Sequence, residues 1–174
     1  MNDLNIDEIK LKLQNSVSTK TYEHCLRTMD EAVRLAIRYN VDKEKAKIAG
    51  LLHDCGKLLN ENAHNILHSK FGAEHAKSNY SVEDIDILNS IRYHTTGREA
   101  MTMLEKIVYI ADKIEPNRNY SGVEEIRSLA YDDIDKAIIK SLMSTIEYVK
   151  QRNLQLDIES VKSLNYLIKG GNNF

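Results

Sequence analysis

Apolar residues recur at intervals of three and four along most of this chain, which is the spacing of one face of an α-helix. The clearest runs predict helices over about 19–39, from 103 until Pro116 breaks the pattern, and over 134–151. One proline and seven glycines in 174 residues leave few turn residues for a β-rich fold. We therefore expect an all-α fold of eight or nine helices. The apolar face of the first of these runs consists of Leu26, Met29, Val33, Ala36 and Ile37.

Residues that can cap a helix stand before most of the predicted starts, where the first N–H groups need acceptors. These signals are Ser18, Asp42, Ser81 followed by Asp84, the pair Thr102 and Glu105, Ser121 followed by Glu124, and Asp157. They open helices from 43 to 54, up to 93, from 121 and from 157 to 170. The residue pattern alone predicts further helices over about 4–14 and 66–79, with a polar loop over 60–65. No repeat or linker interrupts the series, so we expect one domain over residues 1–174.

The charge balance restricts the classes of partner. The formal net charge is −2, which offers no broad basic field for nucleic acid, so we expect no nucleic-acid partner. The two cysteines, Cys25 and Cys55, form no disulfide framework, indicate a reducing compartment and are interpreted as packing residues. The sequence shows no signal peptide and no membrane-spanning segment, and we expect a cytoplasmic protein without a membrane partner.

A His-Asp pair is the first candidate for chemistry, in the run Leu51-Leu52-His53-Asp54-Cys55-Gly56-Lys57. Histidine offers a nitrogen ligand and aspartate a hard oxygen ligand, a combination suited to a catalytic divalent metal. Adjacent helical residues point about 100° apart, but they can converge near the last turn. Gly56 is a residue that can end such a helix. Taken alone, however, a His-Asp pair is also compatible with an ordinary helix end that faces water.

Other polar residues fall on separate predicted helices. His24 and Arg27 share one face because they are three residues apart. His94 follows a helix and leads into Thr95-Thr96-Gly97, and Asp112 lies on an otherwise apolar helix. His68 and His75 are seven residues apart on nearly the same stripe, so spacing alone does not decide which of them is a ligand.

This order of residues resembles the HD-domain metal-dependent phosphohydrolases, and among them the YqeK family of bacterial symmetrical diadenosine tetraphosphate hydrolases. Besides the run 51–57, two strings carry the resemblance, and it spans about 22–120. The all-helical part from 121 to 174 has no histidine and is expected to be a helical scaffold. The strings are Tyr93-His94-Thr95-Thr96-Gly97 and Ile110-Ala111-Asp112-Lys113-Ile114-Glu115-Pro116-Asn117-Arg118.

The resemblance implies two divalent metal ions. One ion would be held by His24, His53, Asp54 and Asp112; His68 and His94 would complete a second site, with Asp54 bridging the two. His64 and His75 are then non-ligands, and the preference for His68 over His75 rests on the resemblance. The family implies iron, and the same nitrogen and oxygen donors would accept manganese, cobalt or zinc in vitro.

Two such ions can share a bridging hydroxide that attacks phosphorus and can grip phosphate oxygens at the same time. Polyphosphate is strongly anionic, so cations should surround the metals, and their alternative is an ordinary solvated surface. The implied catalytic residues are Asp54 and Lys57. The residues expected to bind substrate are Arg27, Lys57, Thr95, Thr96, Gly97 and Arg118, with Gly97 allowing close approach of a phosphate.

The activity that the resemblance implies is cleavage of diadenosine tetraphosphate into two ADP molecules. Nothing in the spacing fixes that position of attack. One alternative is an HD-domain phosphohydrolase that acts on a mononucleotide, a deoxynucleoside triphosphate or a cyclic nucleotide. A second is a non-catalytic nucleotide- or metal-binding module, which would need no pair of metals to generate hydroxide. The helix over 134–151 is a candidate contact for a homodimer.

Overall fold

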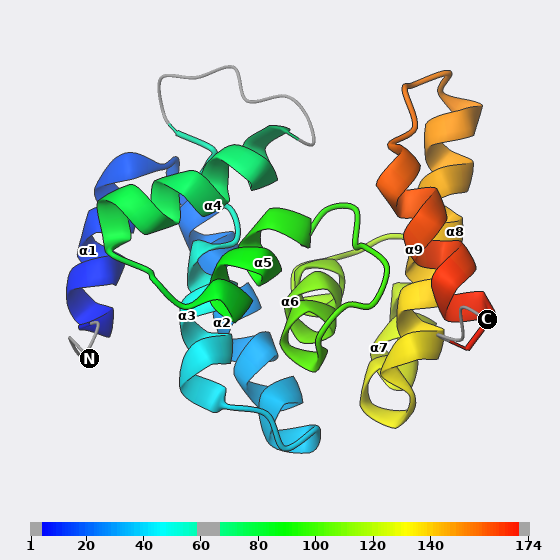
Figure 1. Cartoon of the computed structure of the whole chain (residues 1–174), viewed down its shortest axis with the longest axis horizontal. Coiled ribbons are helices and arrows are strands. Elements are labelled where there is room, and N and C mark those ends of the chain that lie inside the picture. The colour runs from blue at the N-terminus through cyan, green and yellow to red at the C-terminus, as the bar shows by residue number, and fades with distance from the viewer. Residues whose placement is uncertain (1–4, 59–66, 171–174) are drawn as a thin grey trace.

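The computed structural model describes residues 5–58 and 67–170, and these ranges form nine helices and no strand. This confirms the all-α fold (Figure 1). The helices are α1 (Ile6–Ser16), α2 (Thr19–Arg38), α3 (Lys43–Leu52), α4 (Leu67–Tyr80), α5 (Ile85–Tyr93), α6 (Met103–Ile114), α7 (Val123–Asp132), α8 (Ile134–Gln151) and α9 (Ile158–Ile168).

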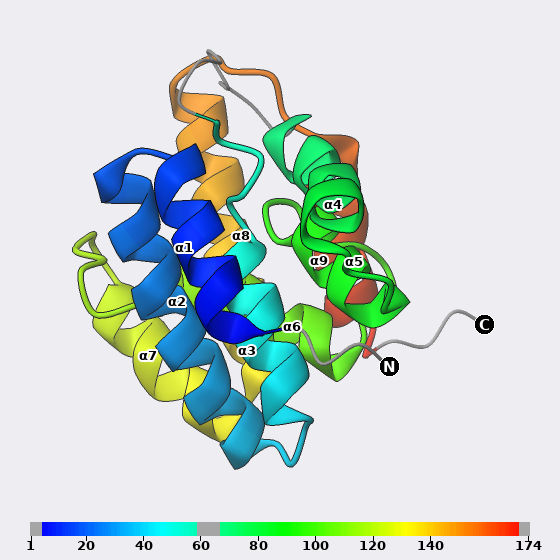
Figure 2. The same cartoon turned by 90° about the vertical axis from the view of Figure 1, so that its left-hand side faces the viewer.

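Helix α6 is the centre of the molecule. It packs against α2, α3, α5, α7 and α8, and most of its side chains, from Leu104 to Ile114, are buried. Figures 1 and 2 show α1, α2 and α3 together on one side of α6 and α7, α8 and α9 on the other. Burial of apolar side chains from both groups against one helix supplies the main stabilisation of the fold. Polar side chains on α6 are therefore held in a rigid setting.

Most of the predicted helix starts are confirmed by side-chain caps. Ser18, Asp42, Thr102 and Asp157 each accept a hydrogen bond from a backbone N–H in the first turn of the following helix. Each residue thereby satisfies an N–H that the helix itself leaves without a partner.

Two starts lie later than the sequence signals placed them. Ser81 adopts a left-handed conformation (φ 55°) after α4, and Asp84 is the residue that caps α5. Helix α7 begins after Gly122, whose φ of 87° suits glycine, and not at Ser121. In both cases a left-handed residue turns the chain before the helix can begin.

One residue of the predicted apolar face is exposed. Ile37 is 67% exposed, because each helical residue turns by about 100° and Ile37 lies to one side of the buried stripe through Ala32, Leu35 and Ala36. The loop predicted over 60–65, with His64, lies outside the described residues. Within the described ranges no helix combines the length and the apolar character that crossing a membrane requires.

Candidate metal centre

The structure brings together all six side chains that the sequence analysis marked as ligands. His24 comes from α2, His53 and Asp54 from the turn after α3, and Asp112 from α6, while His68 lies on α4 and His94 follows α5. His53, Asp54, His94 and Asp112 are buried, and His24 and His68 are partly buried. The residues thus form one cluster in the interior of the helical array.

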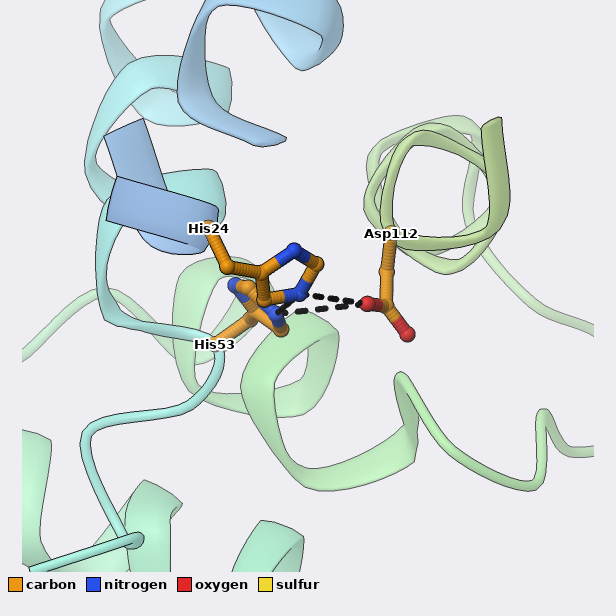
Figure 3. Close-up of side chains that lie close together, drawn as sticks. All are labelled: His24, His53 and Asp112. Carbon is orange, nitrogen blue, oxygen red and sulfur yellow. Dashed lines mark hydrogen bonds and ion pairs between the residues drawn. The ribbon is translucent and has the colours of Figure 1, made fainter. Parts of the chain in front are cut away.

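Three of these residues form the part of the cluster drawn in Figure 3. His24 Nε2 lies 2.9 Å from Asp112 Oδ1, and His53 Nε2 lies 3.5 Å from the same oxygen. The two histidine nitrogens are 3.1 Å apart. The two rings lie together and face the carboxylate of Asp112. Three donor atoms from three segments therefore converge on one small volume.

Asp54 links this group to the other two histidines. Its Oδ2 atom lies 3.4 Å from His53 Nε2 and 3.8 Å from His24 Nε2. Its Oδ1 atom lies 3.2 Å from His68 Nε2 and 3.4 Å from His94 Nε2. The two oxygens of one carboxylate therefore face two different pairs of histidines.

Gly56 allows the turn after α3 to lie against the backbone of α4. A Cβ atom on Gly56 would lie 2.2 Å from the carbonyl oxygen of His68 and 2.9 Å from the nitrogen of Gly72, so only glycine lets the turn touch α4. Helix α3 itself ends at Leu52. The expectation that Gly56 ends this helix was therefore wrong: its role is to place Asp54 next to His68.

The second ring nitrogen of each of three histidines is held by an acceptor. His53 Nδ1 lies 2.8 Å from the carbonyl oxygen of Gly50, and His94 Nδ1 lies 2.7 Å from that of Ile91. A carbonyl can only accept, so Nδ1 carries the proton, and in the neutral ring Nε2 presents its lone pair to the cluster. His24 Nδ1 lies 3.1 Å from Glu115 Oε1. Metal-binding histidines in proteins are oriented in this way.

Glu115 is a site residue that the sequence analysis did not single out. It is buried and accepts hydrogen bonds from His24, from Arg27 Nε at 2.7 Å and from the backbone of Asn117 at 2.8 Å. The only signal in the sequence for a role of Glu115 was its position one turn after Asp112, within the string 110–118 that resembles the family. Arg27, expected to bind substrate, is thus engaged with Glu115 and shares it with His24.

Three cations border the carboxylates. Lys57 Nζ lies 2.8 Å from Asp54 Oδ2, and Arg118 donates to Asp112 Oδ1 at 2.7 Å. Lys113 Nζ lies 2.6 Å from Asp112 Oδ2 and was not among the expected residues. Lys57 and Arg118 each keep 39% of the side chain exposed, so both lie between the cluster and solvent.

The turn Thr95-Thr96-Gly97 after α5 lies between the cluster and α9. Thr95 Oγ1 lies 3.3 Å from His94 Nε2, whereas Thr96 is buried and donates to the carbonyl of Gly97. Gly97 has a φ of 66°, and a Cβ atom there would lie 2.6 Å from Ser163 Oγ on α9. The geometry therefore explains Gly97 by packing against α9, and Thr95 is the member of the turn that reaches the cluster.

Comparison with known proteins assigns this cluster to a family. The model of the family described as "HD domain" matches residues 21–117, which contain all six clustered side chains. The chain belongs to the HD-domain family. This confirms the family expected from the sequence strings.

Relatives of this HD-domain chain cover nearly its whole length. It is 34% identical to the symmetrical bis(5'-nucleosyl)-tetraphosphatase of Bacillus subtilis, over 96% of this chain and all of that protein. It is 35% identical to the protein of the same name from Halalkalibacterium halodurans, over 84% and 88% of the two chains. The crystal structure of a predicted HD superfamily hydrolase involved in NAD metabolism from Clostridium acetobutylicum matches with a TM-score of 0.88 and 39% identity, over 95% and 98% of the chains.

Burial and neighbouring charges set the protonation of the HD-domain cluster. Burial alone would lower the pKa of His53, but the carboxylates of Asp54 and Asp112 raise it to about 9. Burial lowers the pKa of His94 to about 4, although Asp54 opposes this. Burial would raise the pKa of Asp54, but the positive charge of His53 and the nearby histidines hold it well below its usual range. Both the carboxylate of Asp54 and the neutral ring of His94 are thus in the state that metal ligation requires.

The donor set of the HD-domain cluster fits divalent metal ions. Two groups, His24 with His53 and Asp112, and His53 with Asp54 and His94, each have donor atoms within 4.8 Å of one another. Asp54 Oδ1 is buried and, within the described part of the chain, accepts no hydrogen bond of good geometry. A buried carboxylate oxygen is costly without a partner, and a cation would supply one.

Proposed function

We propose that this protein is a metal-dependent phosphohydrolase that cleaves diadenosine tetraphosphate symmetrically into two ADP molecules. The observation that carries the proposal is Asp54, whose two oxygens face separate pairs of histidines. A carboxylate so placed suits a bridge between two ions. The substrate follows from the relatives, because proteins named symmetrical bis(5'-nucleosyl)-tetraphosphatase align over nearly the whole chain.

The proposed metal site has two parts that share Asp54. His24, His53 and Asp112 would hold one ion with Asp54 Oδ2, while His68 and His94 would hold the other with Asp54 Oδ1. When bound, two such ions supply an activated water and positive charge for phosphate oxygens. Iron is the metal that the family resemblance favours, and manganese, cobalt and zinc suit the same nitrogen and oxygen donors.

The cations around the cluster have the task of orienting the phosphate chain. Lys57 and Arg118 are partly exposed and lie within 2.8 Å of the carboxylates. Their ammonium and guanidinium groups can therefore turn towards an incoming polyphosphate without leaving the site. Thr95 offers a hydroxyl at the same opening. Arg27 contributes through Glu115, because its Nε atom is held by that carboxylate.

The experiment that tests the function is product analysis with diadenosine tetraphosphate on anaerobically prepared, iron-loaded protein of known metal content. ADP as the sole product, with two metals per chain, is the expected result. AMP and ATP together would preserve the hydrolase and refute the symmetrical cleavage. Absence of turnover at full metal occupancy would favour another nucleotide substrate or a non-catalytic binding module.

Three broader parts of the proposal concern the whole protein. A single domain over 1–174 agrees with the one connected hydrophobic core. A cytoplasmic location agrees with the buried, unpaired Cys25 and Cys55. Limited proteolysis tests the first, and microscopy of a tagged chain tests the second. A homodimer through α8 stays a prediction, which sedimentation equilibrium tests.

A further inference from the structure

A cavity of about 350 Å³ lies between the end of α6, the start of α7 and helix α8. This size is at the lower end of the range for small-molecule sites, enough for one nucleoside and too small for a dinucleotide. The described residues that line it include no carboxylate. They are Lys113, Tyr120, Ser121, Ile126, Ser141, Ser144, Thr145 and Tyr148.

The cavity begins where the metal centre ends. Lys113 is one of its walls, and the Nζ atom of the same side chain lies 2.6 Å from Asp112 Oδ2 in the cluster. The Lys113 stem runs past Tyr109, with Nζ 5.1 Å from the centre of that ring. A single cation thus borders both spaces, where a phosphate that joins them would lie.

The walls have the chemistry that a nucleoside needs. Tyr120 and Tyr148 keep 38% and 52% of their surface exposed, so both rings are accessible to a base. Tyr120 is fixed by a hydrogen bond from its hydroxyl to the carbonyl of Lys113, at 2.8 Å. Tyr148 has the guanidinium of Arg152 5.0 Å from its ring centre. Hydroxyls of Ser141, Ser144 and Thr145 can pair with a ribose or with the edge of a base.

We propose that this cavity is the nucleoside subsite of the enzyme: it would hold the base and ribose of one ADP half, while Lys113 contacts the phosphate nearest the ribose. The next phosphate would then lie at the metal centre. This inference rests on the proposed function and explains the symmetrical cleavage, because one phosphate separates the held nucleoside from the second phosphorus, which is the one attacked. It also gives residues of α8 a role beyond that of a scaffold.

The test measures binding of ADP and of inorganic pyrophosphate by calorimetry, with protein loaded with the same divalent metal in every case. Tyr148→Ser removes an exposed ring, and Met143→Ser is the matched control, because Met143 is 55% exposed on α8 and does not line the cavity. Stacking of a base on an aromatic ring predicts that Tyr148→Ser weakens ADP binding about ten-fold. Pyrophosphate binding should not change, and Tyr148→Phe should recover most of the ADP affinity.

Unchanged ADP affinity in Tyr148→Ser would overturn the subsite, and so would an equal loss for ADP and pyrophosphate, which would indicate damage at the metal centre. The two proposals fail separately. A wild-type protein that binds ADP through Tyr148 but does not cleave diadenosine tetraphosphate would refute the function alone. Cleavage to ADP with no effect of Tyr148→Ser would refute the subsite alone, and a wild-type protein that neither binds ADP nor cleaves diadenosine tetraphosphate would refute both.

Discussion

Asp54 is the residue that connects the two halves of the candidate metal centre. One oxygen faces His24 and His53 and the other faces His68 and His94. A histidine at this position could offer only one nitrogen to the cluster if its other nitrogen kept an acceptor. His68 faces only the Oδ1 side of Asp54, so the effect of its removal should differ from the effect of removing Asp54.

His68 and His75 provide a matched pair on α4. His68→Ala should lose about one metal per chain and most activity, because His68 Nε2 lies beside Asp54 Oδ1. His75→Ala should change neither, since His75 Nδ1 contacts Asn79 and its ring stacks with Phe71. Metal analysis after gel filtration, together with turnover, measures both. Metal loss in His75→Ala with retention in His68→Ala would reverse the assignment.

Glu115 should act as a positioning residue for His24. Its pKa is lowered, since burial is outweighed by the N–H of Asn117 and by Arg27 and His24. Glu115→Gln keeps the shape but removes the negative charge that faces His24 Nδ1. We expect about a ten- to hundred-fold loss of metal affinity with little change in the unfolding midpoint of the metal-free protein. Metal competition with a chelator measures this loss. An unchanged affinity would assign Glu115 to packing.

At the scale of helices, the starts of α3 and α5 are tied together by one residue. Asp84 caps α5 through the N–H groups of Asp86 and Ile87, and its second oxygen lies 2.8 Å from Lys45 Nζ on α3. Burial would raise the pKa of Asp84, but the Lys45 hydrogen bond and the two N–H groups lower it. A lowered pKa means that ionised Asp84 stabilises the folded state above the pKa of the unfolded chain, and that this stabilisation disappears as the pH falls through the folded pKa.

Asp84→Asn should therefore reduce the free energy of unfolding at pH 7 by up to about 1 kcal/mol, because the pair with Lys45 is partly exposed and screened by solvent. Asparagine keeps the cap, and Asp84→Ala, which removes cap and pair, should cost about 1 kcal/mol more. Urea unfolding at pH 7 and at about pH 3 measures the difference, which should shrink at the lower pH. A difference of equal size at both pH values would rule out the ion pair as its cause.

At the scale of the whole molecule, the metal centre joins α2, α4 and α6 with the segments that follow α3 and α5. Metal bound only by the folded chain stabilises it by about 2.7 kcal/mol at a hundred-fold excess over its dissociation constant. For a chain of this length this corresponds to a rise of about 5–10 °C in the melting temperature. Calorimetry with and without a chelator measures the shift, with Asp54→Ala expected to show none and His75→Ala the full value.

The features that could be predicted from the sequence are those that depend on residues close together in the chain. Helix spacing and caps such as Asp42 and Thr102 are local, and the six clustered side chains followed from strings that resemble a family. Contacts between segments far apart in the chain could not be predicted from the sequence. Glu115 meets His24 across 91 positions, and Gly56 meets the backbone of His68 on another helix. Tyr148 joins a cavity wall only because α8 packs beside the end of α6.

The spread of the clustered residues along the chain has a consequence for biosynthesis. His24, His53 and Asp54 are translated early, but Asp112 is translated only after nearly two thirds of the 174 residues. A nascent chain that has just reached the His-Asp pair therefore contains three of the six proposed ligands, and α6, which anchors the set, has not yet been made. Binding of metal by the full ligand set must then follow synthesis of α6, so the ion meets a chain in which α2 to α6 have already been made.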